Sequence, residues 1–412
     1  MEFPFANVTA NELSFAERDE QYRRLHEWPE RSYSHPSGLR MIWKYDDVRA
    51  ALEAVLPGIT NANSLDPLVG YPRIAVTPAA VFPFIRHLFP PPAKATANLT
   101  DTVLHKQVWD ILGGSGGCFT IAQADRAARE VVFTEQFRAA LESLPSSAGR
   151  GATLDVSALS TLYAARVTGD AVGLAPEMWR DVAMWSGAQS GLLGRPLRGR
   201  ELGDAVCALG WLFTICARAV ARGSDAGGLA QRLRAAGLPR RIAVSAMANS
   251  LAAGVHTVSG TIQQGVQRLL ADPHRAWWSL LPDPAHAAEV AVKLLQLDPG
   301  LVAWKRRADR SITLGSGTTL PPGPVLVMFA AANRDSDAFP RLWDLTGKGK
   351  LPLTFGSGRH VCPGKQLATS AITVFLRELH ALTPNARSLE APAVTGRRPD
   401  LMFSGADITV ST

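Results

Sequence analysis

The chain has 412 residues, of which 46% are hydrophobic and 19% are charged, and it contains ten tryptophans. This composition supplies a large core and excludes a disordered or fibrous chain. The net charge of +7 is basic, yet no Lys/Arg run or aromatic–basic module indicates nucleic-acid binding. We therefore expect a folded protein without a nucleic-acid partner, whose basic surface is either simply solvated or meets an acidic protein.

Cysteine use and hydropathy indicate the compartment. No two cysteines form a CxxC or zinc pattern, and four in a chain of this length make no disulfide scaffold. The first 26 residues lack the basic region and apolar run of a signal peptide. The most apolar run, between Asp204 and Arg218, is too short to span a bilayer and predicts a core helix. These features predict a cytoplasmic protein without a membrane partner.

The expected elements follow in chain order. Residues 85–95 contain a triple proline and predict an ordered loop. Apolar spacing predicts helices from about 120 to 295, with breaks at 149–152 and 237–240. Two β-prone runs around a Gly/Pro turn predict a hairpin over 311–329, and a helix should begin after Gly364. Length alone allows two or three domains, but no linker or repeat divides the chain, so we expect a single domain over 1–412.

A glycine-rich loop with a cysteine precedes that last helix. Phe355, Gly358, Cys362 and Gly364 have the spacing F-x-x-G-x-x-x-C-x-G. Backbone N–H groups and a following helix N-terminus stabilise a thiolate that ligates a metal. The loop resembles the heme-binding signature of cytochromes P-450, and the match is complete. "AANRDSDAF" (331–339) and the hairpin before it also resemble that family, from about residue 100 onward. The resemblance implies a mainly α, helix-rich triangular domain with small β-sheets, of the soluble bacterial type.

The resemblance also implies a cofactor, heme b (iron protoporphyrin IX), with the Cys362 thiolate as axial metal ligand. Phe355 would shield the sulfur from water, and Gly358 and Gly364 would let the backbone turn beneath the flat macrocycle. His360, Arg306 and His105 occupy the family's propionate-binding positions. Trp109 replaces the arginine of the family's H-x-x-x-R helix, and it either donates to a propionate or packs as an ordinary tryptophan.

One departure from the family concerns a buried ion triad. Lys293 and Gln296 replace the Glu and Arg of the usual E-x-x-R, and Gly347 stands where the third partner is expected. A buried arginine without its carboxylate would cost several kcal/mol, so joint loss of all three is physically coherent. We expect local packing to replace the triad.

A second departure lies in the family's oxygen-binding helix. Ala253, Gly254, Val255, His256 and Thr257 stand at the positions of A/G-G-x-D/E-T. The small residues would leave a groove above the iron, and the threonine hydroxyl would take part in proton delivery. His256 replaces the acid, and an imidazole with a pKa near 6.5 passes protons at neutral pH. The alternative is that His256 packs elsewhere.

The resemblance implies a heme-thiolate oxidase or monooxygenase acting on a hydrophobic or aromatic small molecule, in natural-product tailoring. The altered relay keeps open a non-hydroxylating reaction, such as oxidative coupling, ring closure or transformation of a pre-activated substrate. A non-catalytic P-450-like helper is a third reading, against which the intact cysteine argues. Pocket walls should come from 60–95 and a turn near 403–405, with these substrate-binding residues: Asn249, Ala252, Leu301, Val302, Ala303 and Ser404. Asn249 is either a hydrogen-bond anchor for the substrate or a cap at a helix kink.

The resemblance implies ferredoxin and ferredoxin reductase as electron donors to a monomeric enzyme. An acidic ferredoxin would dock on the cysteine side of the molecule. Between 341 and 365 the only acidic residue is Asp344, and the basic residues are Arg341, Lys348, Lys350, Arg359 and Lys365.

Overall fold

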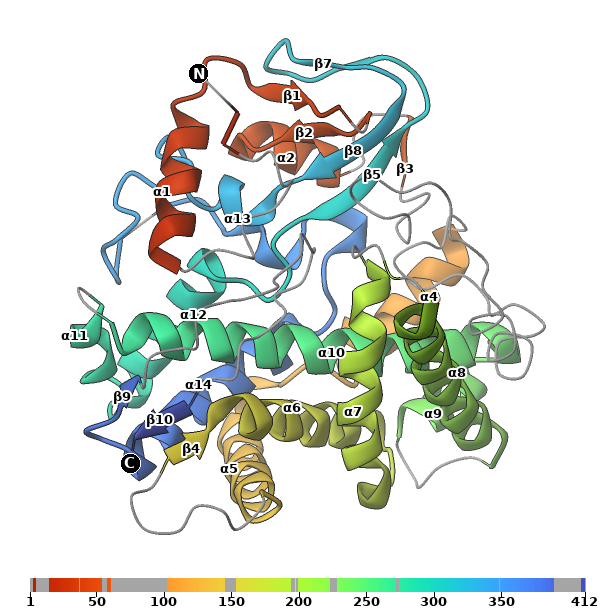
Figure 1. Ribbon diagram of the computed structural model, residues 1–412. Coiled ribbons are helices and arrows are strands. Elements are labelled where there is room, and N and C mark those ends of the chain that lie inside the picture. Colours follow the sequence, from red (N-terminus) through yellow and green to blue (C-terminus); the bar gives the residue numbers. More distant parts are fainter. Residues whose placement is uncertain are drawn as a thin grey trace.

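The computed structural model shows a layer of helices joined to a smaller β-rich region (Figure 1). The helical layer contains the long helix α10 near its centre, and the β-rich region holds the N-terminal strands. The fold is mainly α with small sheets, as the sequence predicts. The structure describes residues 3–4, 15–36, 38–53, 58–60, 102–144, 153–193, 197, 199–222, 228–271, 274–347, 349–388 and 409–411.

Helix α10 (Arg240–Leu269) is thirty residues long, and much of its surface is buried by its neighbours. Its main partner is α6 (Val156–Val172), and the two approach closely at Gly254. A Cβ at Gly254 would lie 2.7 Å from Cγ2 of Thr168, so only glycine fits there without a shift. The other helices of the layer are α4 (Thr102–Gly113), α5 (Arg126–Glu142), α7 (Trp179–Ser190), α8 (Gly199–Arg222), α9 (Leu229–Ala235), α11 (Arg275–Trp278), α12 (Pro284–Leu297) and α14 (Lys365–Leu382).

Two predicted helix boundaries are confirmed. Gly237 has φ +68° just after α9, and α10 begins at Arg240, so the chain breaks at the predicted place. Helix α14 begins directly after Gly364. The other predicted break, at 149–152, lies outside the described residues.

The described residues form three sheets beside the helices. The largest has the strand order β1-β2-β8-β5-β3, in which β2 and β8 run parallel and the other neighbours antiparallel. Two N-terminal helices, α1 (Phe15–His26) and α2 (Tyr45–Leu52), and the short α13 (Phe329–Ala332) lie in the same part of the molecule (Figure 1). The strands are β1 (Ser32–Ser34), β2 (Arg40–Ile42), β3 (Ile59–Thr60), β4 (Thr153–Asp155), β5 (Trp304–Ala308), β6 (Ile312–Thr313), β7 (Thr319–Leu320), β8 (Gly323–Val327), β9 (Arg387–Ser388) and β10 (Thr409–Ser411).

The hairpin predicted over 311–329 is smaller than expected. Only β6 and β7 pair with each other, around a turn in which Gly317 has φ +85°. The second β-prone run forms β8, which pairs with β5 on one side and with β2 on the other. The prediction was wrong here because Val325, Leu326 and Val327 are fully buried, and a central strand of a larger sheet buries them better than an edge hairpin.

The apolar run between Asp204 and Arg218 belongs to a longer helix than predicted, the 24-residue α8. Both α8 and α10 are long and apolar enough to cross a membrane by length and composition alone. In α8 44% of the most apolar window is buried inside the protein, and in α10 56% is. Both helices pack against α7, so the apolar residues serve the core of the helical layer.

Candidate active site

The cysteine loop is held by its own backbone. The Cys362 N–H donates to the Phe355 carbonyl at 2.8 Å, which closes the loop in front of α14. Gly358 has φ +68°, and a Cβ there would lie 2.6 Å from Cα of Glu53 in the segment after α2. Gly364 has an ordinary φ of −87°, and a Cβ there would lie 3.8 Å from the Cys362 sulfur. Gly358 is therefore required by the backbone, whereas Gly364 keeps the surroundings of the sulfur open.

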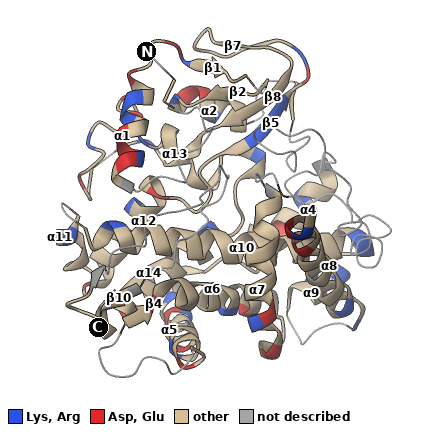
Figure 2. Ribbon diagram, viewed as in Figure 1, with Lys and Arg blue, Asp and Glu red and all other residues tan. Residues whose placement is uncertain are grey.

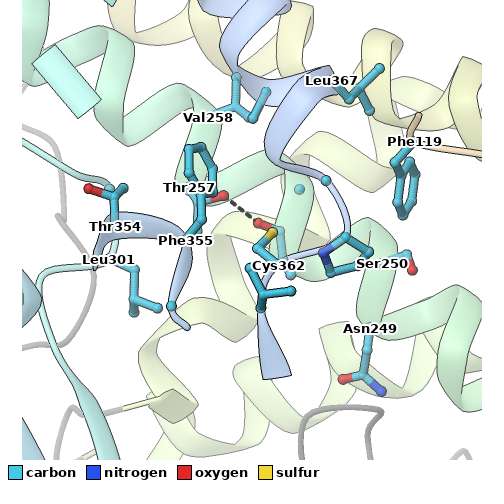
Figure 3. Close-up of a pocket in the computed structure, with 18 of the residues that line it drawn as sticks. Phe119, Asn249, Ser250, Thr257, Val258, Leu301, Thr354, Phe355, Cys362 and Leu367 are labelled. Atoms are coloured by element: carbon cyan, nitrogen blue, oxygen red, sulfur yellow. Dashed lines mark hydrogen bonds between the residues drawn. The ribbon is translucent and has the colours of Figure 1, made fainter. Parts of the chain in front are cut away.

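The cysteine faces a cavity of about 380 Å³ whose lining is mainly apolar. Cys362 lines this cavity and is exposed to it. Ala253, Gly254 and Thr257 of α10 line the same cavity, in which Figure 3 labels Thr257 and Cys362. Burial raises the pKa of the Cys362 thiol, and the Gly364 N–H partly opposes that rise. A metal ion at the sulfur would favour the thiolate instead.

Basic groups gather at one end of the cavity. The rings of His105 and His360 meet edge to face, 4.5 Å apart, and Arg306 lies nearby on β5. Arg306 is 6% exposed, and its one hydrogen bond within the described residues goes to the Lys305 carbonyl at 3.3 Å. Burial lowers its pKa to about 10. Burial, followed by His105 and Arg306, lowers the pKa of His360 to about 3.

Helix α4 packs against the cysteine loop. The Trp109 indole N–H donates to the Val361 carbonyl at 2.9 Å, one residue before the cysteine. One turn later, a Cβ at Gly113 would lie 2.7 Å from Cβ of Pro363. Because its N–H is already bonded, Trp109 does not serve as a propionate donor in this conformation, and that reading is corrected. The indole instead fixes the loop that presents Cys362.

On α10 the predicted oxygen-site residues separate into two groups. Ala253, Gly254 and Thr257 line the cavity, and the Thr257 hydroxyl donates to the Ala253 carbonyl at 2.6 Å (Figure 3). His256 is half-buried and is not among the described residues that line the cavity. Adjacent helix residues point about 100° apart, so a helix that turns Thr257 to the cavity turns His256 towards its edge. The structure thus does not bring His256 to the site.

Known proteins share this architecture. No protein-family model matches the chain. The heme domain of a Tepidiphilus thermophilus P-450 superposes with a TM-score of 0.80 over 99% of this chain and 96% of that one, at 18% identity. Cytochrome P-450 CREJ, solved with (4-ethylphenyl) dihydrogen phosphate, gives 0.79 over 98% and 99%, at 20% identity.

Curated relatives match over shorter segments. Cytochrome P-450 BJ-3 of Bradyrhizobium diazoefficiens is 32% identical over 177 residues, which are 39% of this chain and 37% of that one. Nocardicin C N-oxygenase of Nocardia uniformis subsp. tsuyamanensis is 30% identical over 168 residues, 39% and 42% of the two chains. The aligned segment thus spans about two fifths of each relative's length. The chain is homologous to cytochromes P-450 and has their fold.

P-450 relatives and neighbours imply a heme with a cysteine thiolate ligand, and the residues of this cavity fit such a group. The Cys362 sulfur lines the cavity. Among the described residues, Arg306 lacks a carboxylate partner, and Nδ1 of His360 is buried without a hydrogen-bond partner. Buried polar and charged groups of this kind are costly unless an anion pairs with them. Heme propionates supply such anions.

The predicted substrate-binding residues are only partly brought together. Asn249, Ala252 and Leu301 line the cavity. Val302 and Ala303 do not, and this part of the prediction is corrected. They are 3% and 1% exposed, in a second core cluster that includes residues of α1 and β2. The chain passes the cavity at Leu301 and Trp304 and turns the intervening side chains to the opposite face. Ser404, the turn at 403–405 and all but the first residue of 60–95 lie outside the described residues.

A hydrogen-bond network replaces the family's ion triad. Lys293 donates to the Gln296 side chain at 3.1 Å and to the Leu342 carbonyl at 3.0 Å. Gln296 donates to the Asn333 carbonyl at 2.9 Å. The Asn333 side chain accepts from the Leu353 N–H at 2.6 Å, two residues before Phe355. The expectation of simple packing was incomplete, because buried polar groups at these positions still need partners.

Sequence reasoning missed several lining residues. Phe119 follows α4, and Thr168 and Gln189 lie on α6 and α7, in helices without a recognised motif. Their amphipathic spacing signals only that each helix buries one face, not which residue meets a cavity. The close approach of Thr168 to Gly254 was the one available clue, since a helix glycine often marks tight packing.

Proposed function

We propose that this P-450 is a heme-thiolate oxidoreductase of the monooxygenase type that acts on a hydrophobic or aromatic small molecule. The carrying observation is the Cys362 sulfur, which faces a largely apolar cavity that Ala253 and Thr257 also line. The heme, when bound, supplies the oxidising chemistry, and the protein supplies binding, orientation and electrostatics.

Each predicted residue then has one task. Cys362 ligates the iron, and His105, Arg306 and His360 hold the propionates by charged hydrogen bonds. Phe355, whose backbone pairs with the cysteine, limits water at the sulfur. On α10 the small side chains of Ala253 and Gly254 leave room beside the reacting centre, and the Thr257 hydroxyl carries a proton towards it.

A tailoring step in natural-product biosynthesis is the finer form of this proposal. It is supported by relatives whose names describe such reactions, including nocardicin C N-oxygenase and the 20-oxo-5-O-mycaminosyltylactone 23-monooxygenase of Streptomyces fradiae. The apolar lining suits molecules of that kind.

A non-hydroxylating reaction is the second candidate, and one observation favours it. No acid lines the cavity within the described residues, and His256, which replaces the family's acid, is absent from the lining too. Oxidative coupling, ring closure or transformation of a pre-activated substrate would tolerate a weak proton relay. A non-catalytic helper would have no need of a cysteine that faces the cavity.

We further propose that ferredoxin and its reductase supply electrons at the cysteine side. The steering charge there is smaller than the sequence suggests. Arg341 lies 3.3 Å from Asp344, and Lys350 lies 2.6 Å from Asp46 of α2. Lys365 is exposed, whereas Lys348 lies outside the described residues. We also propose a cytoplasmic monomer with a single domain over 1–412.

The absorption spectrum of the reduced, carbon-monoxide-bound protein tests the central proposal. The reduced protein should bind carbon monoxide with the strongly red-shifted Soret band of a thiolate-ligated heme. Cys362→Ala should lose that band and all turnover, while Cys118→Ala, which changes a cysteine outside the cavity lining, should keep both. A retained band in Cys362→Ala would show that another group ligates the iron.

A further inference from the structure

Several polar side chains of α7 and α10 line the cavity. Among them are Gln189, Asn249, Ser250 and Thr257. Figure 3 shows Asn249 and Ser250 on neighbouring positions of α10, across from the cysteine loop. The direction of each hydrogen bond decides what these groups can offer to a bound molecule.

Both amides use their nitrogens on the protein. Nδ2 of Asn249 donates to the Ser245 carbonyl at 2.7 Å and to the Ser245 hydroxyl at 3.1 Å. Nε2 of Gln189 donates to the Ser186 carbonyl at 3.3 Å. A carbonyl cannot donate, so the nitrogen of each amide must be the atom that faces it. Both N–H groups of Asn249 are thus used, and its Oδ1 is the amide atom left for the cavity, whereas Gln189 offers its Oε1 and its second N–H.

The two hydroxyls behave in the same way. Ser250 donates its single hydrogen to the Ala246 carbonyl at 2.8 Å, and Thr257 donates to the Ala253 carbonyl at 2.6 Å. Each hydroxyl then keeps only lone pairs for other partners. Asn249 and the two hydroxyls thus present acceptors to the cavity, because their donors are used within the helix, and Gln189 adds an acceptor oxygen beside one remaining N–H.

The charge of the cavity lining also limits which ligand charges are favourable. No Asp or Glu lines the cavity within the described part of the chain, and Arg306 adds a positive charge to the lining. A cationic ligand would lose its hydration on entering the cavity and would find no counter-charge there, so its desolvation cost would be large. A neutral donor, such as a hydroxyl or N–H group, has no such cost.

We propose that this cavity selects uncharged, mainly apolar molecules that carry a hydroxyl or N–H group, and that Asn249 and Gln189 accept the hydrogen bond. This inference deepens the proposed function by naming the substrate class. It rests on that function in one respect, that the cavity is the substrate site. The bonded donor would anchor one end of the molecule at α7 and α10, and the apolar remainder would extend towards Cys362.

Matched ligand pairs test the selection. Dissociation constants for the heme-loaded protein are measured by equilibrium dialysis with 4-phenylphenol against 4-methoxybiphenyl, and with indole against 1-methylindole. The methyl cap removes the donor and adds apolar surface, so the hydrophobic effect alone favours the capped member. We expect the donor of each pair to bind about ten-fold more tightly, the worth of one hydrogen bond in an apolar site.

Variants locate the acceptors. In the double variant Asn249→Leu, Gln189→Leu, the dissociation constant of the capped member divided by that of the donor should fall to one or below. Ser259→Ala changes a back-bonded serine of the same helix that is outside the lining, and it should keep the wild-type ratio. Equal affinities within both pairs for the wild type, or a preference that survives the double variant, would overturn the proposal. Because dialysis does not use the thiolate spectrum, failure of the proposed function would appear separately, as a missing red-shifted band.

Discussion

Strand β5 carries two adjacent arginines whose surroundings differ. Arg306 is 6% exposed and lies at the cavity, whereas the Arg307 side chain is 43% exposed and lies 3.8 Å from Asp309. Side chains alternate along a strand, so one arginine points inward and its neighbour outward. Arg306→Ala should remove a charged hydrogen bond to a propionate, worth about 1.5–3 kcal/mol, and weaken heme binding roughly ten- to a hundred-fold.

Arg307→Ala is the matched control for that change. An exposed ion pair contributes little, about 0–1 kcal/mol, so this variant should keep wild-type heme affinity. The measurement is the rate at which heme passes to an excess of apomyoglobin. Equal transfer rates for both variants would remove Arg306 from the propionate site.

His256 is the residue at which sequence and geometry disagree. Its position in the motif predicts a proton relay, but it does not join Thr257 in the lining of the cavity. We expect His256→Phe to leave product formed per NAD(P)H consumed near the wild-type value, with no rise in released peroxide. A true general acid–base group would contribute roughly 10²–10⁴-fold. Thr257→Val should lower the yield, and a loss of that size in His256→Phe instead would restore the relay.

At the scale of elements, the sequence predicted those set by local signals. The start of α14 after Gly364 and the break before α10 at Gly237 follow from glycine conformation and helix periodicity. The pairing of β8 could not be predicted in this way. One partner, β2, lies far away in the sequence, and the other, β5, is separated from β8 by the β6–β7 pair. Family position predicted that both Leu301 and Val302 form the pocket wall, but Leu301 lines the cavity and Val302 does not, since backbone rotation between them depends on the second core cluster.

Asn333 connects three elements that support the cysteine loop. Its side chain accepts from the Leu353 N–H, donates to the Gln296 carbonyl at 3.2 Å and donates to the Thr354 hydroxyl at 2.9 Å. Asn333→Ala should leave these buried groups unsatisfied and lower the free energy of unfolding by about 2–4 kcal/mol. Urea denaturation measures the change, with Thr346→Ala in an exposed turn as control. A loss below about 0.5 kcal/mol, the usual effect of a surface substitution, would contradict the supporting role.

At the scale of the whole molecule, a buried ion network joins the N-terminal helix to the helical layer. Acidic and basic residues follow one another along α1 (Figure 2). Arg18 lies 3.1 Å from Asp298, which follows α12, and Asp19 lies 2.7 Å from both Arg268 of α10 and Arg334 after α13. Partners up to 315 residues apart in the chain are set only by tertiary packing. Local sequence reading therefore could not pair them.

Asp298 is the centre of that network and gives it a pH dependence. Burial acts to raise its pKa, but Arg268 and Arg18 outweigh burial and hold the pKa well below its ordinary value. A carboxylate with a depressed pKa in the folded state stabilises the fold above its unfolded pKa of about 3.9 and loses that contribution as pH falls below it. The network should therefore be at full strength at neutral pH.

Asp298→Asn should lower the free energy of unfolding at pH 7 by about 3–5 kcal/mol, because it leaves buried arginines without their counter-charge. Asp344→Asn removes one carboxylate of an exposed pair with Arg341 and should cost about 0–1 kcal/mol. The difference between wild type and Asp298→Asn should shrink below about pH 4, where the wild-type carboxylate begins to lose its advantage over the unfolded chain. Urea denaturation from pH 3 to pH 7 measures both effects. A difference that stays constant over this range would mean that Asp298 acts by shape rather than by charge.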